Sequence, residues 1–180
     1  MSGHNKWSQI KHKKGITDQK RGQLFSKMVK AISIAARDNP DPKTNIRLRS
    51  VIEKARSLNV PNENIERAVS KNSEKSNLTE AIYEAYGPEK TAMVIKTITD
   101  NKNRTFNDIK KTLGENNSKI ADPGSVLWAF KSESNLLTPQ YPQRISPENL
   151  PLLEKLIEDL EALDDVQEII TNAENISLKN

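Results

Sequence analysis

Residues 78–99, LTEAIYEAYGPEKTAMVIKTIT, contain two strand-like runs separated by a turn signal. The runs at 78–86 and 91–99 are rich in β-branched and aromatic residues, which favour a pleated sheet. Gly87 and Pro88 between them are typical of a tight connection. The segment therefore predicts a β-hairpin, and it marks the point at which the hydrophobic period changes from helical to strand-like.

The residues after this hairpin alternate between helical and strand-like patterns. Apolar residues at helical spacing predict helices at 104–116 and 146–163, the second of them opened by a Ser-Pro-Glu start signal. Further strands are expected at 125–130, 135–141 and 166–171. Strand, helix, strand, strand, helix, strand is the ferredoxin-like order, so we predict a plait with two helices on one face of its sheet.

The aromatic residues of this half are predicted to be core residues. Trp128 and Phe130 alternate in the expected strand at 125–130 and would therefore face the same side of the sheet. Tyr83 and Phe106 are interpreted in the same way.

The residues before the hairpin have the helical period. They predict helices at 18–38 and 44–58 and a short one that begins at Pro61 and ends before Asn72. The polar segment 72–77 is a plausible linker. The sequence thus predicts an α+β protein, with a basic three-helix domain and its N-terminal arm at 1–77 and a ferredoxin-like αβ plait domain at 78–180.

Charge is divided unevenly between these two parts. The chain of 180 residues has 28 Lys or Arg and 24 Asp or Glu, but residues 1–79 hold 17 of the basic residues and 7 of the acidic ones. The first thirty residues alone carry eight Lys or Arg against one acid. Because such a density of cations is typical of a phosphate-binding surface, we predict that the N-terminal part contacts nucleic acid.

The predicted contact residues are the cations of this segment together with Trp7 and His12. On the helix at 18–38, Lys20, Lys27 and Lys30 are expected on a cationic strip opposite the apolar face, while Arg21 lies near the edge of that face. Trp7 either stacks on an exposed base or anchors the arm on the helical domain. The full set is Lys6, Trp7, Lys11, His12, Lys13, Lys14, Lys20, Arg21, Lys27 and Lys30.

Residues that could support catalysis or metal binding are few. The chain has no cysteine and only two histidines, His4 and His12, which do not share a helix face. Asp164 and Asp165 are interpreted as turn residues, and no glycine-rich phosphate loop is present. We therefore expect a protein that is not an enzyme, with no metal, no cofactor and no small-molecule substrate.

No run approaches the roughly 20 apolar residues of a membrane span, and the N-terminus lacks the apolar stretch of a signal peptide. We expect a cytoplasmic protein without a membrane partner. Lys102 and Arg104 place positive charge at a helix start and are a weaker candidate for a second anion contact.

Several long strings resemble one known family. GHNKWSQIKHKKG at 3–15, NIRLRSVIEKARSLNVPNENIERAV at 45–69, TDNKNRT at 99–105 and DPGSVLWAF at 122–130 are similar to segments of the YebC/PmpR family. The resemblance covers nearly the whole chain in order. It implies a basic N-terminal helical domain and one or two ferredoxin-like αβ domains.

The resemblance also implies a function and shows one departure. It implies a transcriptional regulator that binds DNA through its basic N-terminal domain; the alternative is a ribosome-associated translational activator that contacts RNA. Family members typically insert a further αβ module after the segment that corresponds to SVLWAF. Here only about fifteen residues, 131–145, fill that place, so we expect a chain without the third domain.

Overall fold

A computed structural model describes residues 18–70, 77–133 and 136–174. Contacts divide the chain into two compact units. The helical unit contains the described residues from Asp18 to Thr79 together with Ile98–Asp100. The sheet unit contains Glu80–Thr97 and the described residues from Asn101 onward. Each unit is described by itself.

Within residues 18–70, the helical unit forms three helices, α1 (Asp18–Ala36), α2 (Ile46–Ser57) and α3 (Asn62–Ser70). Their positions agree with the helices that the sequence predicts. Their apolar faces meet in one core because each helix has its buried residues at helical spacing. The fully or nearly fully buried residues of this core are Met28, Ile32, Ala35, Ala36, Leu48, Ile52, Ala55, Val60, Ile65 and Ala68.

Asn45 connects the end of α1 to the start of α2 by hydrogen bonds. Its side-chain Oδ1 accepts the backbone N–H of Leu48 at 2.9 Å, which caps the helix. Its Nδ2 donates to the carbonyl oxygens of Ala35 at 2.7 Å and Asn39 at 2.6 Å. One amide side chain therefore satisfies backbone groups at the end of α1 and at the start of α2.

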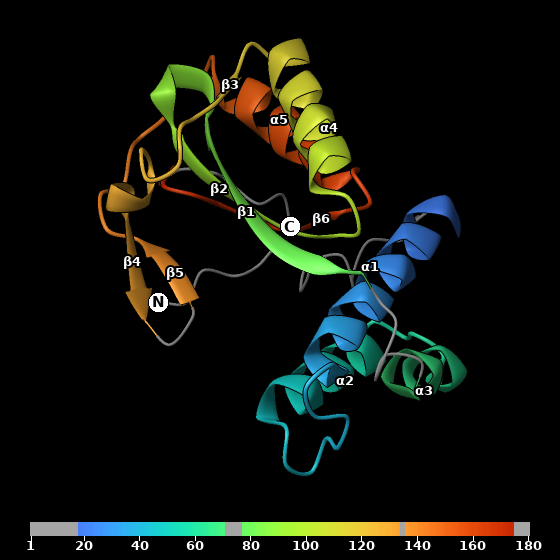
Figure 1. The fold of residues 1–180 in the computed structure, drawn as a ribbon. Coiled ribbons are helices and arrows are strands. Elements are labelled where there is room, and N and C mark those ends of the chain that lie inside the picture. Colours follow the sequence, from blue (N-terminus) through green and yellow to red (C-terminus); the bar gives the residue numbers. More distant parts are fainter. Residues whose placement is uncertain (1–17, 71–76, 134–135, 175–180) are drawn as a thin grey trace. The chain divides into compact units, whose positions relative to one another are not determined.

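The sheet unit is built around a four-stranded antiparallel sheet in the part of the chain that the structure describes (Figure 1). The hairpin predicted at 78–99 is present as β1 (Thr79–Tyr86) and β2 (Ala92–Thr99), the two central strands. The edge strands are β3 (Lys119–Ile120) beside β1 and β6 (Val166–Thr171) beside β2. Ala85 lies opposite Ile120, and Val94 lies opposite Ile170.

Both faces of β2 are covered, because its residues alternate between two cores. Met93 and Ile95 pack under α4 (Lys102–Glu115) and α5 (Leu150–Glu161), which lie side by side on one face of the sheet (Figure 1). Ala92 and Val94 belong to a second core on the other face, with Val126, Ala129 and Phe130. A strand buried on both faces reads as a continuous apolar run, and the run AMVI in β2 fits this rule.

The strand expected at 125–130 is wrong. Residues 122–125 form a turn with Gly124 at a φ of 84°, and Leu127–Ala129 form the short 3₁₀ helix η4. Glu84, buried on β1, accepts the backbone N–H groups of Gly124, Val126 and Leu127. Because these donors are engaged by a carboxylate, they are not available to pair with a strand.

The residues that follow form a separate hairpin. β4 (Phe130–Glu133) and β5 (Leu136–Pro139) pair antiparallel in a two-stranded sheet of their own. The α+β class is confirmed, and two helices do cover one face of a four-stranded sheet. The expected order of strands along the chain is wrong. In the predicted plait, the strand that lies between β3 and β2 would come after β3 in the sequence. In the structure this place is filled by β1, which comes before β2.

α5 begins later than the sequence predicts, at Leu150 instead of after Ser146. The carboxylate of Glu89, from the loop between β1 and β2, accepts hydrogen bonds from the hydroxyl of Ser146, from the side-chain Nδ2 of Asn149 at 2.8 Å and from the backbone N–H of Ser146 at 3.0 Å. These hydrogen bonds lower the pKa of Glu89, since they favour its charged form. The residues before α5 are thus held by a partner that lies far away in the sequence.

Candidate nucleic-acid interface

The predicted contact residues fall into two groups. Six of them lie outside the described residues, and their role stays a prediction: Lys6, Trp7, Lys11, His12, Lys13 and Lys14. The remaining four lie on α1 and are Lys20, Arg21, Lys27 and Lys30.

The cations of α1 do not form one solvent-facing strip. Lys20 and Arg21 are exposed at the start of the helix and Lys30 is half-buried, but Lys27 is only 1% exposed. The expectation that Lys27 faces solvent is therefore wrong. Leu24 and Ile34, which share its side of the helix, are also buried, so the covered arc of α1 is wider than the apolar pattern indicates.

α2 supplies exposed cations that the sequence did not single out as contact residues. Arg47 and Lys54 lie on one flank of the helix and Arg49 and Arg56 on the other, because residues seven apart share a face. All four are exposed, while Leu48, Ile52 and Ala55 between the two flanks face the core. The i, i+7 spacing in NIRLRSVIEKAR was the available signal for these two rows.

The described residues 18–70 carry eleven Lys or Arg and six Asp or Glu. Most of the basic residues are exposed, and an exposed guanidinium can bind a phosphate through two parallel N–H donors. The surface of the helical unit is therefore suited to a polyanion, with arginines predominating on α2.

A groove of about 550 Å³ lies between α1 and α3. Phe25, Val29 and Ala68 give it apolar walls, and Arg67 and Asn64 add polar groups from α3. The groove is open at Gly22 of α1, because a Cβ at this position would meet no atom within 4 Å. The full lining is Gly22, Phe25, Ser26, Val29, Ser33, Asn64, Arg67 and Ala68.

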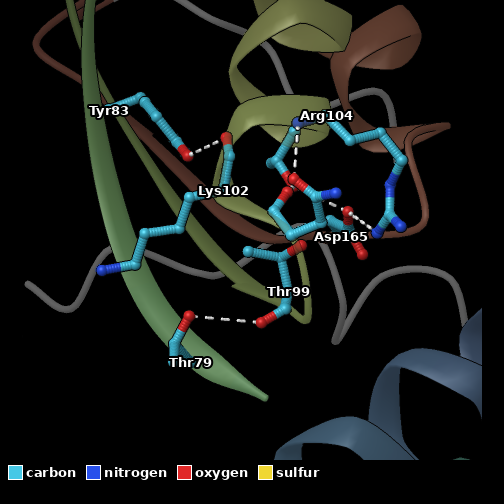
Figure 2. Close-up of polar contacts among 8 residues, drawn as sticks. Thr79, Tyr83, Thr99, Lys102, Arg104 and Asp165 are labelled. Atoms are coloured by element: carbon cyan, nitrogen blue, oxygen red, sulfur yellow. Dashed lines mark hydrogen bonds and ion pairs between the residues drawn. The ribbon is translucent and has the colours of Figure 1, made fainter. Parts of the chain in front are cut away.

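In the sheet unit, the motif TDNKNRT forms a polar site at the start of α4 (Figure 2). Asn101 caps the helix by accepting the backbone N–H of Arg104 at 3.1 Å. The guanidinium of Arg104 and the hydroxyl of Thr105 each lie 2.8 Å from Oδ2 of Asp165, at the start of β6. Asp165 is therefore buried and binds two residues in the first turn of α4. Its interpretation as a turn residue did not include this role.

Tyr83 completes this site. Its hydroxyl donates to the carbonyl oxygen of Lys102 at 3.1 Å, as Figure 2 shows. Burial raises the pKa of Tyr83, and the negative charge of Asp165 raises it further, because both disfavour the phenolate. The site holds α4 on the sheet and leaves the side chain of Lys102 pointing away from the Arg104 and Asp165 pair.

Within the described residues, no cluster of three or more His, Cys, Asp or Glu side chains is arranged to hold a metal ion. None of the helices described here combines the length and the apolar character required to cross a membrane.

These features define a class, an α+β protein with a basic three-helix unit and an antiparallel sheet unit. Family models agree with this division. The model of the TACO1/YebC protein N-terminal domain matches residues 5–75, and the model of the TACO1/YebC second and third domain matches residues 78–140. The chain belongs to the TACO1/YebC family.

Relatives support this assignment. A probable transcriptional regulatory protein of Petrotoga mobilis is 42% identical over 182 residues, which cover 98% of this chain and 72% of the relative. One from Roseiflexus castenholzii is 37% identical, with 98% and 73% covered. The crystal structure of a conserved hypothetical protein from Aquifex aeolicus matches with a TM-score of 0.82 at 29% identity, over 93% of this chain and 96% of that one. The chain is therefore shorter than these two regulatory relatives and shares the fold of the Aquifex protein.

Proposed function

We propose that this chain is a non-enzymatic regulatory protein that binds DNA through its basic helical unit and its N-terminal arm. The observation that carries the proposal is the surface of that unit, where Lys20 and Arg21 of α1 and four cations of α2 are exposed. Phosphate contacts of this kind supply most of the sequence-independent affinity for nucleic acid. The names of the relatives, probable transcriptional regulatory proteins, support a role in transcription.

A second candidate is a ribosome-associated translation factor that contacts RNA. It is favoured by the composition of α3, which in the described residues carries Arg67 as its single long basic side chain. A helix that reads bases in the major groove usually presents several side chains to base edges. A surface that contacts phosphates alone would suit structured RNA as well as duplex DNA.

The binding surface is tested by charge reversal on the full chain. The variant Lys11→Glu, Lys13→Glu, Lys14→Glu changes the arm, and Arg47→Glu, Arg49→Glu, Arg56→Glu changes α2. A matched control with the same change of charge is Lys90→Glu, Lys131→Glu, Arg144→Glu, three exposed positions of the sheet unit. Binding to labelled duplex DNA is measured by fluorescence anisotropy over a series of salt concentrations.

If about five phosphates are neutralised, the logarithm of affinity should fall against the logarithm of salt with a slope of about −4.5 on duplex DNA. Each triple variant should lose at least about tenfold in affinity and flatten this slope by about 2 to 3, while the control changes neither. Binding by both variants that equals the control would overturn the proposed surface.

Competition identifies the polymer. Promoter fragments, random duplex DNA and ribosomal RNA are added in turn to the complex. Stronger competition by promoter fragments than by random duplex supports transcriptional control. Stronger competition by ribosomal RNA, together with co-sedimentation with ribosomes that survives DNase, supports the translation factor instead.

A further inference from the structure

The two helices of the sheet unit carry opposite charge. Residues 80–180 hold 17 Asp or Glu and 11 Lys or Arg, so this half of the chain is acidic. α4 nevertheless contains four cations and two acids, whereas α5 contains four acids and one lysine. Because the two helices lie side by side on one sheet face (Figure 1), the unit has a basic and an acidic side.

The basic residues of α4 share its surface with two amides and an aromatic ring. Thr105, Ile109, Thr112 and Leu113 are buried on the side that faces the core. At 100° per residue, Lys102, Phe106 and Lys110 form one row along the flank of this buried side, and Asn103 and Asn107 lie beside that row. All five side chains are exposed, and we call these five residues the α4 outer face. Lys102 and Lys110 have no carboxylate partner among the described residues.

Phe106 is unusual in this position. It was predicted as a core residue, but it is 37% exposed. Its ring centroid lies 6.2 Å from that of Tyr83, and Nζ of Lys110 lies 6.0 Å from its own centroid. A partly exposed ring beside a cation, on a surface that also carries amide groups, is a suitable platform for an unpaired base.

The site at the start of α4 attaches this helix to the sheet. Asn101 caps the helix, and Arg104 and Thr105 both bind Asp165 (Figure 2). Arg104 is thereby occupied as an anchor. Lys102 points away from that anchor in Figure 2, so its ammonium group is available to a phosphate.

We propose that the α4 outer face is a second nucleic-acid contact surface, and that it takes an unpaired strand. Lys102 and Lys110 contact phosphates, and one base stacks on Phe106. The row Lys102, Phe106, Lys110 follows the i, i+4 spacing, which brings successive side chains to within about 6 Å of one another. The inference rests on the proposed function in one respect, that the chain binds nucleic acid.

An unpaired strand fits this surface better than a duplex. Base stacking on a side chain requires a base that is free of its neighbour, and the bases of a duplex are stacked on each other. The amides of Asn103 and Asn107 can donate and accept hydrogen bonds at the edge of such a base. A duplex would meet the lysines alone.

The test uses the full chain, a labelled unpaired oligonucleotide and a duplex of the same length. One variant reverses charge on the α4 outer face, Lys102→Glu, Lys110→Glu. A second, Phe106→Leu, removes the stacking surface but keeps an apolar side chain beside Tyr83. The control with the same change of charge is Lys90→Glu, Arg144→Glu, two exposed positions of the sheet unit. Circular dichroism with thermal unfolding confirms that each variant is folded.

We expect the α4 charge variant to lose at least about tenfold in affinity for the unpaired strand and to flatten its salt slope by about 1.4. Phe106→Leu should lower the affinity for the unpaired strand about fivefold or more and leave its salt slope unchanged, because stacking is not ionic. Phe106→Leu should change the affinity for the duplex by less than about twofold. The control should keep its affinity for the unpaired strand within about threefold.

The inference is overturned if the α4 charge variant binds the unpaired strand like the control, or if Phe106→Leu weakens the duplex as much as the unpaired strand. If the arm and α2 variants lose binding while the α4 variants do not, the proposed function stands and this inference fails. If the unchanged chain shows no salt-dependent binding to either polymer, both fail.

Discussion

The carboxylate of Glu84 on β1 accepts the backbone N–H of Val126 at 2.8 Å, across 42 positions of the chain. Glu84 is 6% exposed, and the N–H groups of Gly124 and Leu127 also donate to it. Three donors satisfy a buried charge that would otherwise be costly. This carboxylate holds the segment 124–127 against the sheet, where Val126 enters the second core.

Glu84→Ala should therefore destabilise the sheet unit by about 2–3 kcal/mol, because it leaves three backbone donors without an acceptor. Trp128 reports on the change, since its Nε1 donates to the carbonyl oxygen of Ser125 at 2.8 Å. Urea unfolding followed by Trp128 fluorescence, in a Trp7→Phe background, measures it. The exposed neighbour change Glu80→Ala is the control, and an equal effect of the two would contradict this role of Glu84.

Asp165→Ala should also destabilise the sheet unit, by about 2 kcal/mol. The buried carboxylate joins Arg104 and Thr105 to β6, and its loss leaves the hydroxyl of Thr105 without this acceptor. The cost is limited because Arg104 is 48% exposed and can be rehydrated. Chemical unfolding is the measurement, and Asp164→Ala, at an exposed adjacent position, should cost less than about 1 kcal/mol.

The titration of Tyr83 tests the electrostatics of the same site. Burial is the larger cause of its raised pKa, and the charge of Asp165 is the smaller one. Asp165→Asn removes that negative charge, so the pKa of Tyr83 should fall but stay above its ordinary value of 10.0. NMR of tyrosine labelled at Cζ follows each phenol separately. A pKa that does not move would show that Asp165 does not act on this ring.

Asn45→Ala should destabilise the helical unit by about 1–2 kcal/mol. The substitution removes the cap of α2 and the two hydrogen bonds that Asn45 donates to the end of α1. Thermal unfolding measures the loss. Ser50→Ala, an exposed position within the same helix, should change stability by less than about 0.5 kcal/mol, and parity between the two variants would refute the double role of Asn45.

Glu89 should make stability depend on pH. Hydrogen bonds from Ser146 and Asn149 lower its pKa from an ordinary value of 4.5. A carboxylate whose pKa is lower in the folded state than in the unfolded state stabilises the folded protein. This contribution is complete above the unfolded-state pKa and is lost as the pH falls through the folded-state pKa. Its stabilisation is therefore present at pH values above about 4.5 and declines below that value.

Glu89→Gln should accordingly be less stable than the unchanged chain at neutral pH and approach it in acid. Unfolding curves between neutral and acidic pH give the comparison. Glu115→Gln is the control, since Glu115 is exposed and only 3.9 Å from Lys111 in a surface pair. A difference between Glu89→Gln and the unchanged chain that stays constant with pH would exclude this linkage.

Local pattern was enough to predict most elements of the fold. The helices α1 to α4 and the hairpin of β1 and β2 lie where helical and alternating periods placed them. SVLWAF has the composition of a strand, yet Gly124 at a positive φ and the hydrogen bonds to Glu84 hold most of it out of the sheet. Trp128, predicted to be buried, is 60% exposed for this reason, while Phe130 is buried as predicted.

The candidate interface, too, was predicted in part by the sequence and in part revealed only by the structure. The sequence identified the basic segment because charge density is a property of composition, and it placed Lys20 and Arg21 on a helix. It could not show that Lys27 is covered or that Phe106 is open to solvent, because a single helix pattern does not reveal what packs on its flanks. The exposed arginines of α2 had a spacing signal, because Leu48 and Ile52 at helical spacing predict the side that faces the core, and the structure has both residues buried.

The sequence by itself therefore determined the amphipathic helices, the central hairpin, the charge asymmetry and the family, since each depends on residues close together in the chain or on composition. The tertiary structure decided which strand fills each place in the sheet, and the roles of Glu84, Glu89 and Asp165. Each of these carboxylates binds donors 40 to 61 positions away. A local pattern carries no information about such partners, because folding alone brings them within hydrogen-bonding distance.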